Sequence, residues 1–158
     1  MNSRPVCMGD SELLRRWRND PLTREMSLTN YEVMEGEHAL WLDEILRDRT
    51  KRLFIVTEQH RDGLSHLGTF RLDGAGSDVV EISLTVAPDW RGVGLATPII
   101  EMAMKEAAIL GAKDAVAVVR VENTPSQRAF ERAGFTVDFE TGGTRYYGRK
   151  IPVATASV

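Results

Sequence analysis

Apolar residues in the first third of the chain recur at helical spacing. They predict a helix from about Ser11 to Asn19, which Asp20-Pro21 would end, and a second helix from about Gly36 to Arg49. The segment between them, Leu22 to Glu35, is polar with scattered apolar residues and has no regular period. We therefore expect two helices joined by an irregular segment.

The pattern then changes to the two-residue period of strands. Short links rich in Gly and Asp separate three apolar runs, which favours hairpins and antiparallel pairing. In the third run apolar and polar residues alternate, so one face of that strand is more polar than the other. The predicted strands are Arg52 to Glu58, Ser65 to Asp73 and Val79 to Ala87.

The second half of the chain alternates between helix and strand. An apolar stripe predicts a long helix from about Gly94 to Leu110, and a continuous apolar run predicts a covered strand from Asp114 to Val121. A short helix follows, for which we expect Thr124 as N-cap and Gln127 as the partner in a capping box. The last stretch predicts a hairpin that turns at Thr141 to Gly143.

This order of elements predicts an α/β (α+β) fold with a mixed, mostly antiparallel central sheet flanked by about four helices. One more short strand is expected near Arg4 to Met8. A chain of 158 residues leaves little room for a second domain. We expect one domain over residues 1–152 and a frayed tail over 153–158.

Composition mainly excludes functions. Apolar residues make up 42% of the chain and charged residues 27%, with a net charge of -3 and both signs interspersed, which is typical of a soluble globular domain and argues against nucleic-acid binding. The single cysteine, Cys7, excludes an internal disulfide. No export signal or membrane span is indicated, so we expect a cytoplasmic chain. The three histidines lack metal-ligand spacing, so no metal site is expected.

The stretch Asp-Trp-Arg-Gly-Val-Gly-Leu-Ala, residues Asp89 to Ala96, opens the long helix with two glycines and an arginine. The first amides of a helix are unpaired and its N-terminal end is positive, which favours an anion. Gly92 and Gly94 would let the backbone approach a phosphate, and Arg91 adds a charge. The residues alone leave three interpretations open: a turn that merely needs glycine, a dinucleotide site and a site for another phosphate-bearing ligand.

This turn resembles the R/Q-x-x-G-x-G/A motif of the GNAT acetyltransferase superfamily, carried here by Arg91, Gly94 and Ala96. The later stretch Glu-Asn-Thr-Pro-Ser-Gln-Arg-Ala-Phe-Glu-Arg-Ala-Gly-Phe resembles the second signature of that superfamily, in which an Asn opens a short helix that ends in Gly-Phe. Asn123 and Phe135 are its first and last matching residues. The resemblance extends over nearly the whole chain.

The resemblance implies a domain that binds acetyl-CoA between two splayed strands, the one before the glycine turn and the one after the long helix. In the superfamily the first of these strands carries a bulge and pairs with pantetheine through its backbone. The implied cofactor-binding residues are Leu84, Thr85, Val86, Arg91, Gly92, Val93, Gly94, Leu95, Ala96, Thr97, Asn123, Ser126 and Phe130.

The resemblance also implies a direct transfer of the acetyl group to an amine. The amide of Leu84 would polarise the thioester carbonyl. Glu81, on the polar face of the same strand, is the candidate general base, with His38 and His66 as alternatives. Many members place a Tyr in the second signature to protonate the thiolate, but this chain has Phe130 there. A tyrosine of the last hairpin, Tyr146 or Tyr147, is the candidate substitute, with Tyr146 preferred.

Acceptor choice in this superfamily depends on the N-terminal helices, the segment after them and the last hairpin. The N-terminal stretches resemble two branches, nucleotide-sugar amine acetyltransferases and ribosomal-protein (RimJ/RimL-type) or polyamine acetyltransferases. Nearby glutamates would suit a polyamine and nearby arginines a nucleotide sugar, so the acceptor stays open. The candidate substrate-binding residues are Trp17, Arg18, Met26 and His38.

Two functions therefore remain at this stage. The first is an N-acetyltransferase that acts on a small-molecule or peptide amine, including an amino sugar nucleotide or a protein N-terminus. The alternative is a non-catalytic acyl-CoA sensor on the same fold, which Phe130 in place of Tyr keeps open. Many relatives form homodimers, and the sequence leaves the oligomeric state of this chain open.

Overall fold

The N-terminal third forms a short strand and a set of helices. The computed structural model describes residues 1–27 and 30–153, and the predicted tail lies outside these residues from position 154 onward. The elements are β1 (Asn2–Pro5), the 3-10 turn η1 (Met8–Asp10), α1 (Ser11–Asn19), α2 (Pro21–Met26) and α3 (Glu35–Arg47). Both predicted helices are thus confirmed to within two residues.

The segment from Leu22 to Glu35, expected to be irregular, contains the helix α2, so that prediction is wrong in part. Asp20 caps this helix, because its carboxylate accepts a hydrogen bond from the amide of Thr23 at 3.2 Å. Pro21 occupies the first helical position, where its missing N–H costs nothing. The Asp-Pro pair that ends α1 therefore also begins α2.

The remaining elements build one sheet and two further helices. They are β2 (Lys51–His60), β3 (Gly63–Asp73), β4 (Val79–Val86), the 3-10 turn η2 (Pro88–Trp90), α4 (Ala96–Ile109), β5 (Asp114–Arg120), α5 (Thr124–Arg132), β6 (Thr136–Thr141) and β7 (Thr144–Lys150). The strand order is β1-β2-β3-β4-β5-β7-β6, and each neighbouring pair is antiparallel except β4 and β5.

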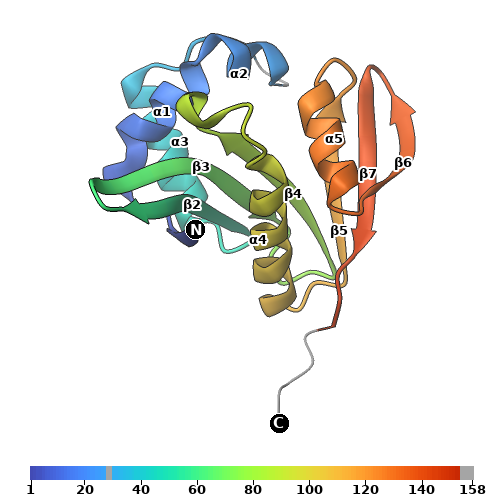
Figure 1. Ribbon diagram of the computed structural model, residues 1–158. Coiled ribbons are helices and arrows are strands. Elements are labelled where there is room, and N and C mark those ends of the chain that lie inside the picture. The colour runs from blue at the N-terminus through green and yellow to red at the C-terminus, as the bar shows by residue number, and fades with distance from the viewer. Residues whose placement is uncertain (28–29, 154–158) are drawn as a thin grey trace.

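The two faces of the sheet carry different helices (Figure 1). Successive side chains of a strand point to opposite faces, so Ile55 packs in a cluster with α1 and α3, and Val56 packs in the larger cluster with α4 and α5. α4 supplies most of the helical part of this larger core through Ile99, Ile100 and their neighbours. The main core therefore lies between the sheet and α4.

α5 begins one residue earlier than the sequence indicated. Asn123, not Thr124, is the N-cap, because its Oδ1 accepts a hydrogen bond from the amide of Ser126 at 3.3 Å. Gln127 does not complete a capping box. Its Nε2 instead donates to the carbonyl oxygens of Arg120 at 3.0 Å and Val121 at 2.7 Å, which fixes α5 against the end of β5.

β4 and β5 separate along their length, as the family resemblance implied. Within the described residues they pair only from Val79–Glu81 to Asp114–Val116, and the rest of each strand diverges (Figure 1). β4 stays paired with β3 up to Val86, in a register without a bulge over these described residues, so the expected bulge is absent. A Cβ at Gly68 of β3 would overlap the carbonyl oxygen of Thr85, so glycine lets β3 lie close to β4 beside the gap.

Candidate functional site

A cavity of about 570 Å³ lies where β4 and β5 diverge. Its walls come from α2, the end of β4, the glycine turn with the start of α4, and α5. Eleven of the thirteen predicted cofactor-binding residues line it, all except Val93 and Phe130. The lining residues are Leu22, Thr23, Met26, Ser27, Leu84, Thr85, Val86, Trp90, Arg91, Gly92, Gly94, Leu95, Ala96, Thr97, Asn123, Pro125, Ser126, Arg128, Ala129 and Arg132.

The backbone of β4 offers unpaired polar groups to this cavity. The amide of Ala87 donates to the carbonyl oxygen of Leu67 at 2.8 Å, just beyond the last β3–β4 ladder pair. In an antiparallel pair, residues that bond to the neighbour alternate with residues whose N–H and C=O point away from it. Leu84 and Val86 therefore direct their backbone groups away from β3, into the gap that β5 has left.

The glycine turn brings a helix end to the same place. Gly92 and Gly94 have φ angles of 75° and 79°, a left-handed conformation that side chains rarely adopt. A Cβ at either residue would meet no described atom within 4 Å, so no neighbouring side chain requires glycine there. The space beside the turn is thus open to a ligand, and the unpaired amides at the start of α4 favour an anionic one.

The side chain of Arg91 is engaged by α2. Its Nη2 lies 2.6 Å from the Asp20 carboxylate and 2.7 Å from the hydroxyl oxygen of Thr23. Burial would raise the pKa of Asp20, but the hydrogen bonds from Arg91 and from the Thr23 amide outweigh it and hold that pKa below its ordinary value. Arg91 therefore joins the glycine turn to the N-terminus of α2.

Two arginines that sequence reasoning missed also line the cavity. Arg128 and Arg132 lie one turn apart on α5, are exposed, and have no ion-pair or hydrogen-bond partner within residues 1–27 and 30–153. Like charges at this spacing repel by about 0.2–0.5 kcal/mol. Together with Arg91 they are the only charged side chains among the described residues that line the cavity, so it attracts an anion. Their four-residue spacing in the second signature was the available signal.

The two candidate proton-transfer groups lie on one face of the sheet, on opposite sides of the gap. Glu81 pairs with Val116, Tyr146 pairs with Val118, and residues two apart on a strand share a face. Glu81 is half-buried. Burial first, and the carboxylate of Asp73 second, raise the pKa of Glu81 above its ordinary value. Neither side chain is among the residues that line the cavity.

The structure places Phe130 and Tyr147 in the core, away from the cavity. Phe130 is 2% exposed and packs edge-on against Phe135 at a ring distance of 5.1 Å. The hydroxyl of Tyr147 donates to Glu131 at 3.1 Å, and burial is the main cause that raises the pKa of Tyr147. Tyr146 stacks on Phe139 with ring centroids 4.4 Å apart. Val93, the other cofactor candidate outside the lining, is 65% exposed on the turn.

The four predicted substrate-binding residues do not lie together at one site. Met26 lines the main cavity. His38 is 3% exposed, and its Nδ1 lies 3.0 Å from the hydroxyl oxygen of Ser11. This contact joins α3 to α1, so His38 lies in the packing between the two helices, where burial, followed by the charge of Arg15, lowers its pKa. His66, the other alternative base, is partly buried on β3 and does not line the cavity.

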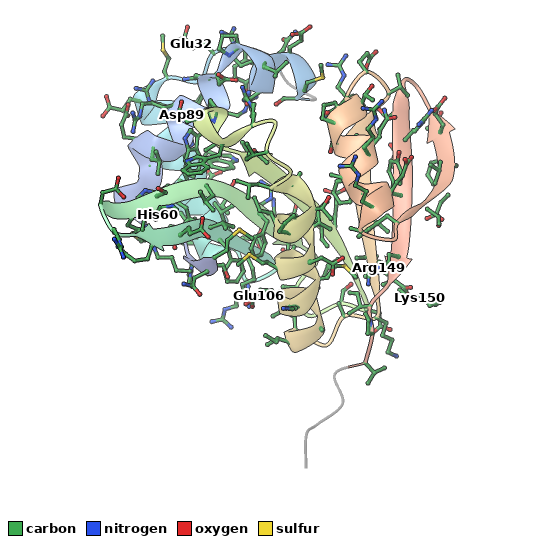
Figure 2. All side chains as sticks on the ribbon, in the orientation of Figure 1. Glu32, His60, Asp89, Glu106, Arg149 and Lys150 are labelled. Carbon is green, nitrogen blue, oxygen red and sulfur yellow. The ribbon has the colours of Figure 1, made fainter. Side chains whose placement is uncertain are left out.

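Trp17 lines a second cavity of about 400 Å³ beside α1, together with residues of both charges. Figure 2 shows Glu32 and Asp89, two of its acidic members, at the end of the molecule where α1 and α2 lie. Arg18, the remaining candidate, is partly buried on α1 and lines neither cavity. Some of the residues that suggested opposite acceptors, Glu32 on one side and Arg15 and Arg16 on the other, thus line the same second cavity.

The described part of the chain contains no cluster of three or more His, Cys, Asp or Glu side chains arranged to hold a metal ion. In residues 1–27 and 30–153, no helix combines the length and the apolar character needed to cross a membrane.

Comparison with known proteins identifies related sequences. The family model of the acetyltransferase (GNAT) domain matches residues 3–136. Phosphinothricin N-acetyltransferase from Streptomyces viridochromogenes is 27% identical over 114 residues, which are 71% of this chain and 62% of that protein. The chain therefore aligns with less than two thirds of the length of this relative.

Solved structures match more of the chain at lower identity. A domain from Methanocaldococcus jannaschii has a TM-score of 0.85 at 20% identity, over 94% of this chain and 97% of that one. Spermidine N-acetyltransferase from Vibrio cholerae, crystallised with CoA and spermine, has a TM-score of 0.81 at 20% identity, over 95% of each chain. At this identity both structures establish a shared fold.

Proposed function

The chain belongs to the GNAT acetyltransferase family, and we propose that it is an N-acetyltransferase that moves an acetyl group from acetyl-CoA directly to a primary amine. The observation that carries this proposal is the cavity at the separation of β4 and β5, which joins free backbone groups to an anion-binding turn. The family and the relatives named as N-acetyltransferases favour an enzyme and give no support to a non-catalytic sensor.

The chemistry of the cavity fits both ends of acetyl-CoA. Phosphates would lie at the turn of Gly92 and Gly94, beside the start of α4, with Arg128 and Arg132 on the other side. Pantetheine amides would pair with the free backbone groups of β4 at Leu84 and Val86. Acetyl-CoA supplies a thioester carbonyl for attack and a thiolate that leaves.

The residues of the chain would then orient the amine and handle its protons. The amide of Leu84 would donate to the carbonyl oxygen as negative charge develops there, which in other acyl transfers contributes several kcal/mol. Glu81, acting through water, would remove a proton from the amine, and its raised pKa suits a base that works near neutral pH. Tyr146, on the same face across the gap, would protonate the thiolate.

Substitution of Glu81 with Gln tests the general base. We expect turnover to fall by about 100-fold with little change in acetyl-CoA affinity. In the wild type the rate should fall as pH drops through the raised pKa of Glu81. Asp73→Asn removes one cause of that elevation, so this acidic limb should move to lower pH. A Glu81→Gln enzyme with full turnover and an unchanged pH profile would assign the base to another group.

The acceptor is proposed only as a class, a primary amine of a small molecule or of a protein N-terminus. Release of free CoA should be measured with spermidine, phosphinothricin, an amino sugar nucleotide and peptides with basic N-termini. The arginines that line the cavity are proposed to hold the phosphates of acetyl-CoA, so they do not discriminate among these acceptors. Thermal-shift titration with acetyl-CoA tests the cofactor independently, since a ligand of the native state must raise its stability.

A further inference from the structure

α2 forms one wall of the cavity without being anchored in the core. Leu22, Thr23 and Met26 line the cavity, yet none of the six residues of α2, all of them described, is buried. In Figure 1 this helix lies at the end of the molecule where the gap between β4 and β5 is widest, with α5 on the opposite side. Burial of apolar side chains therefore does not determine where this wall lies.

Arg91 holds the first end of α2. Its guanidinium contacts the Asp20 carboxylate, which caps the helix, and the Thr23 hydroxyl. Arg91 follows η2 and belongs to the β4 side of the gap. This end of the wall is therefore tied to the glycine turn.

Arg120 holds the second end. Its Nη1 donates to the carbonyl oxygens of Glu25 at 3.1 Å and Ser27 at 3.2 Å. The last carbonyls of a helix have no partner within it, and a cation there interacts favourably with the helix dipole. The Nε of Arg120 also lies 3.5 Å from the carboxylate of Glu122, but this ion pair is exposed and contributes little. Arg120 is the last residue of β5, so this end of α2 is tied to the other diverging strand.

We propose that Arg120 is a positioning residue for the acceptor amine. With Arg91 it holds α2 across the gap, so that Leu22 and Met26 form a wall of fixed position against which the acceptor packs. The inference that this wall faces an acceptor rests on the proposed function, whereas the attachment of α2 can be tested alone.

The first experiment needs no acceptor. Trypsin can cleave after Arg24, inside α2, and the cleavage rate of the native protein reports how often that helix opens. We expect Arg120→Ala to raise the rate at Arg24 by about tenfold, because both hydrogen bonds from the guanidinium to the end of α2 are lost. Arg120→Lys keeps a donor and should restore most of the protection. Glu122→Ala, which removes only the ion pair, should behave like the wild type. Unchanged cleavage in Arg120→Ala overturns the proposal.

The second experiment separates positioning from general damage. With spermidine and phosphinothricin as probes, Arg120→Ala should raise the KM for any acetylated probe by about tenfold. Its acetyl-CoA affinity, measured by thermal shift, should stay within about twofold of the wild-type value, because the glycine turn is untouched. Equal losses for both substrates would overturn the positioning role. A wild-type protein that fails to bind acetyl-CoA would defeat the proposed function instead, while the cleavage rates would still report on Arg120.

Asp20→Asn tests the other end of α2 in the same way. It removes the charge that Arg91 contacts but keeps a side-chain oxygen for the cap of α2. Cleavage after Arg24 should rise again, by less than in Arg120→Ala, because the Thr23 hydroxyl still accepts from Arg91. No increase would show that Arg91 does not hold the helix.

Discussion

Two helices that contribute walls to the cavity, α4 and α2, are held in different ways. α4 has five buried residues and forms the centre of the main core. None of the described residues of α2 is buried, and charged and polar contacts hold it at both ends. The side of the site proposed for acetyl-CoA is thus fixed by apolar packing, and the side proposed for the acceptor by polar bonds.

The largest expected effect compares one residue of each helix. Ile100 of α4 is fully buried and Leu22 of α2 is 45% exposed. Ile100→Ala should lower the free energy of unfolding by about 2–5 kcal/mol, since it removes apolar contacts and leaves a cavity. Leu22→Ala should change it by no more than about 0.5 kcal/mol. Urea denaturation measures both values. Similar losses in the two variants would break the comparison.

The second prediction concerns acetyl-CoA binding at the glycine turn, at the start of α4. Gly94→Val should weaken acetyl-CoA binding by about 100-fold, because its side chain would enter the open space beside the turn. A residue other than glycine also strains the left-handed backbone, by about 1–2 kcal/mol. Gly76→Val is the matched control, since Gly76 has a φ of 92° in an open loop outside the cavity lining. Titration calorimetry should show normal affinity in the control and a loss in Gly94→Val; equal affinity in both would mean that the turn holds no ligand.

The two free arginines of α5 predict a smaller effect on the same binding reaction. The double variant Arg128→Ala, Arg132→Ala should bind acetyl-CoA about tenfold more weakly, and its affinity should depend less on salt. Arg47→Ala removes an exposed arginine of α3 outside the cavity and should have no effect. An unchanged salt dependence in the double variant would show that these arginines do not contact bound acetyl-CoA.

The smallest expected effect is on the pH dependence of stability, and it comes from the contact between Arg4 and Asp10. Two hydrogen bonds from Arg4, followed by the one from the Cys7 amide, hold the pKa of Asp10 at about 2, although burial opposes them. The folded-state pKa lies below the unfolded one, so this contribution is present above pH 4 and is lost as pH falls toward 2. Because Arg4 is partly exposed, we expect it to be only about 1 kcal/mol.

Asp10→Asn should therefore lose about 1 kcal/mol of stability at pH 7 and show a weaker pH dependence than the wild type between pH 4 and 2. Urea denaturation at both pH values measures this difference. The penalty from Ile100→Ala should be similar at the two pH values, because it involves no titrating group. A penalty of equal size for Asp10→Asn at pH 7 and pH 2 would contradict the assignment of the low pKa to Asp10.

The same contrast explains which parts of the structure the sequence could predict. α4 has a regular apolar period and its glycine turn has strong backbone requirements, so the bounds of this helix were predicted to within two residues. α2 has no apolar stripe, and its Asp-Pro start was interpreted only as the end of α1. At the start of α5, Asn123 and Thr124 are both residues that commonly cap helices, so the sequence did not distinguish between them. The structure uses Asn123 as the cap, and Gln127 contacts the end of β5.

The sequence also did not predict which side chains pair when the two residues are far apart along the chain. The motif indicated that Arg91 could reach phosphate oxygens, but its observed partner, Asp20, is 71 residues away. Likewise, Arg149, labelled in Figure 2, donates to Glu101 of α4 and to the carbonyl oxygen of Ala133 just after α5, and so joins the two helices that flank the main core. Periodicity indicates which face a side chain occupies, whereas a pairing of this kind depends on the assembled fold.

The lack of buried residues in α2 also affects how the sequence of such a protein can evolve. Most substitutions that are purged from a population are those that push the fold below its stability threshold. Since α2 contributes little buried surface, its residues are free to vary without approaching that threshold. On the proposal that the acceptor packs against α2, substitutions in this helix can therefore change acceptor preference while the core of the molecule is inherited unchanged.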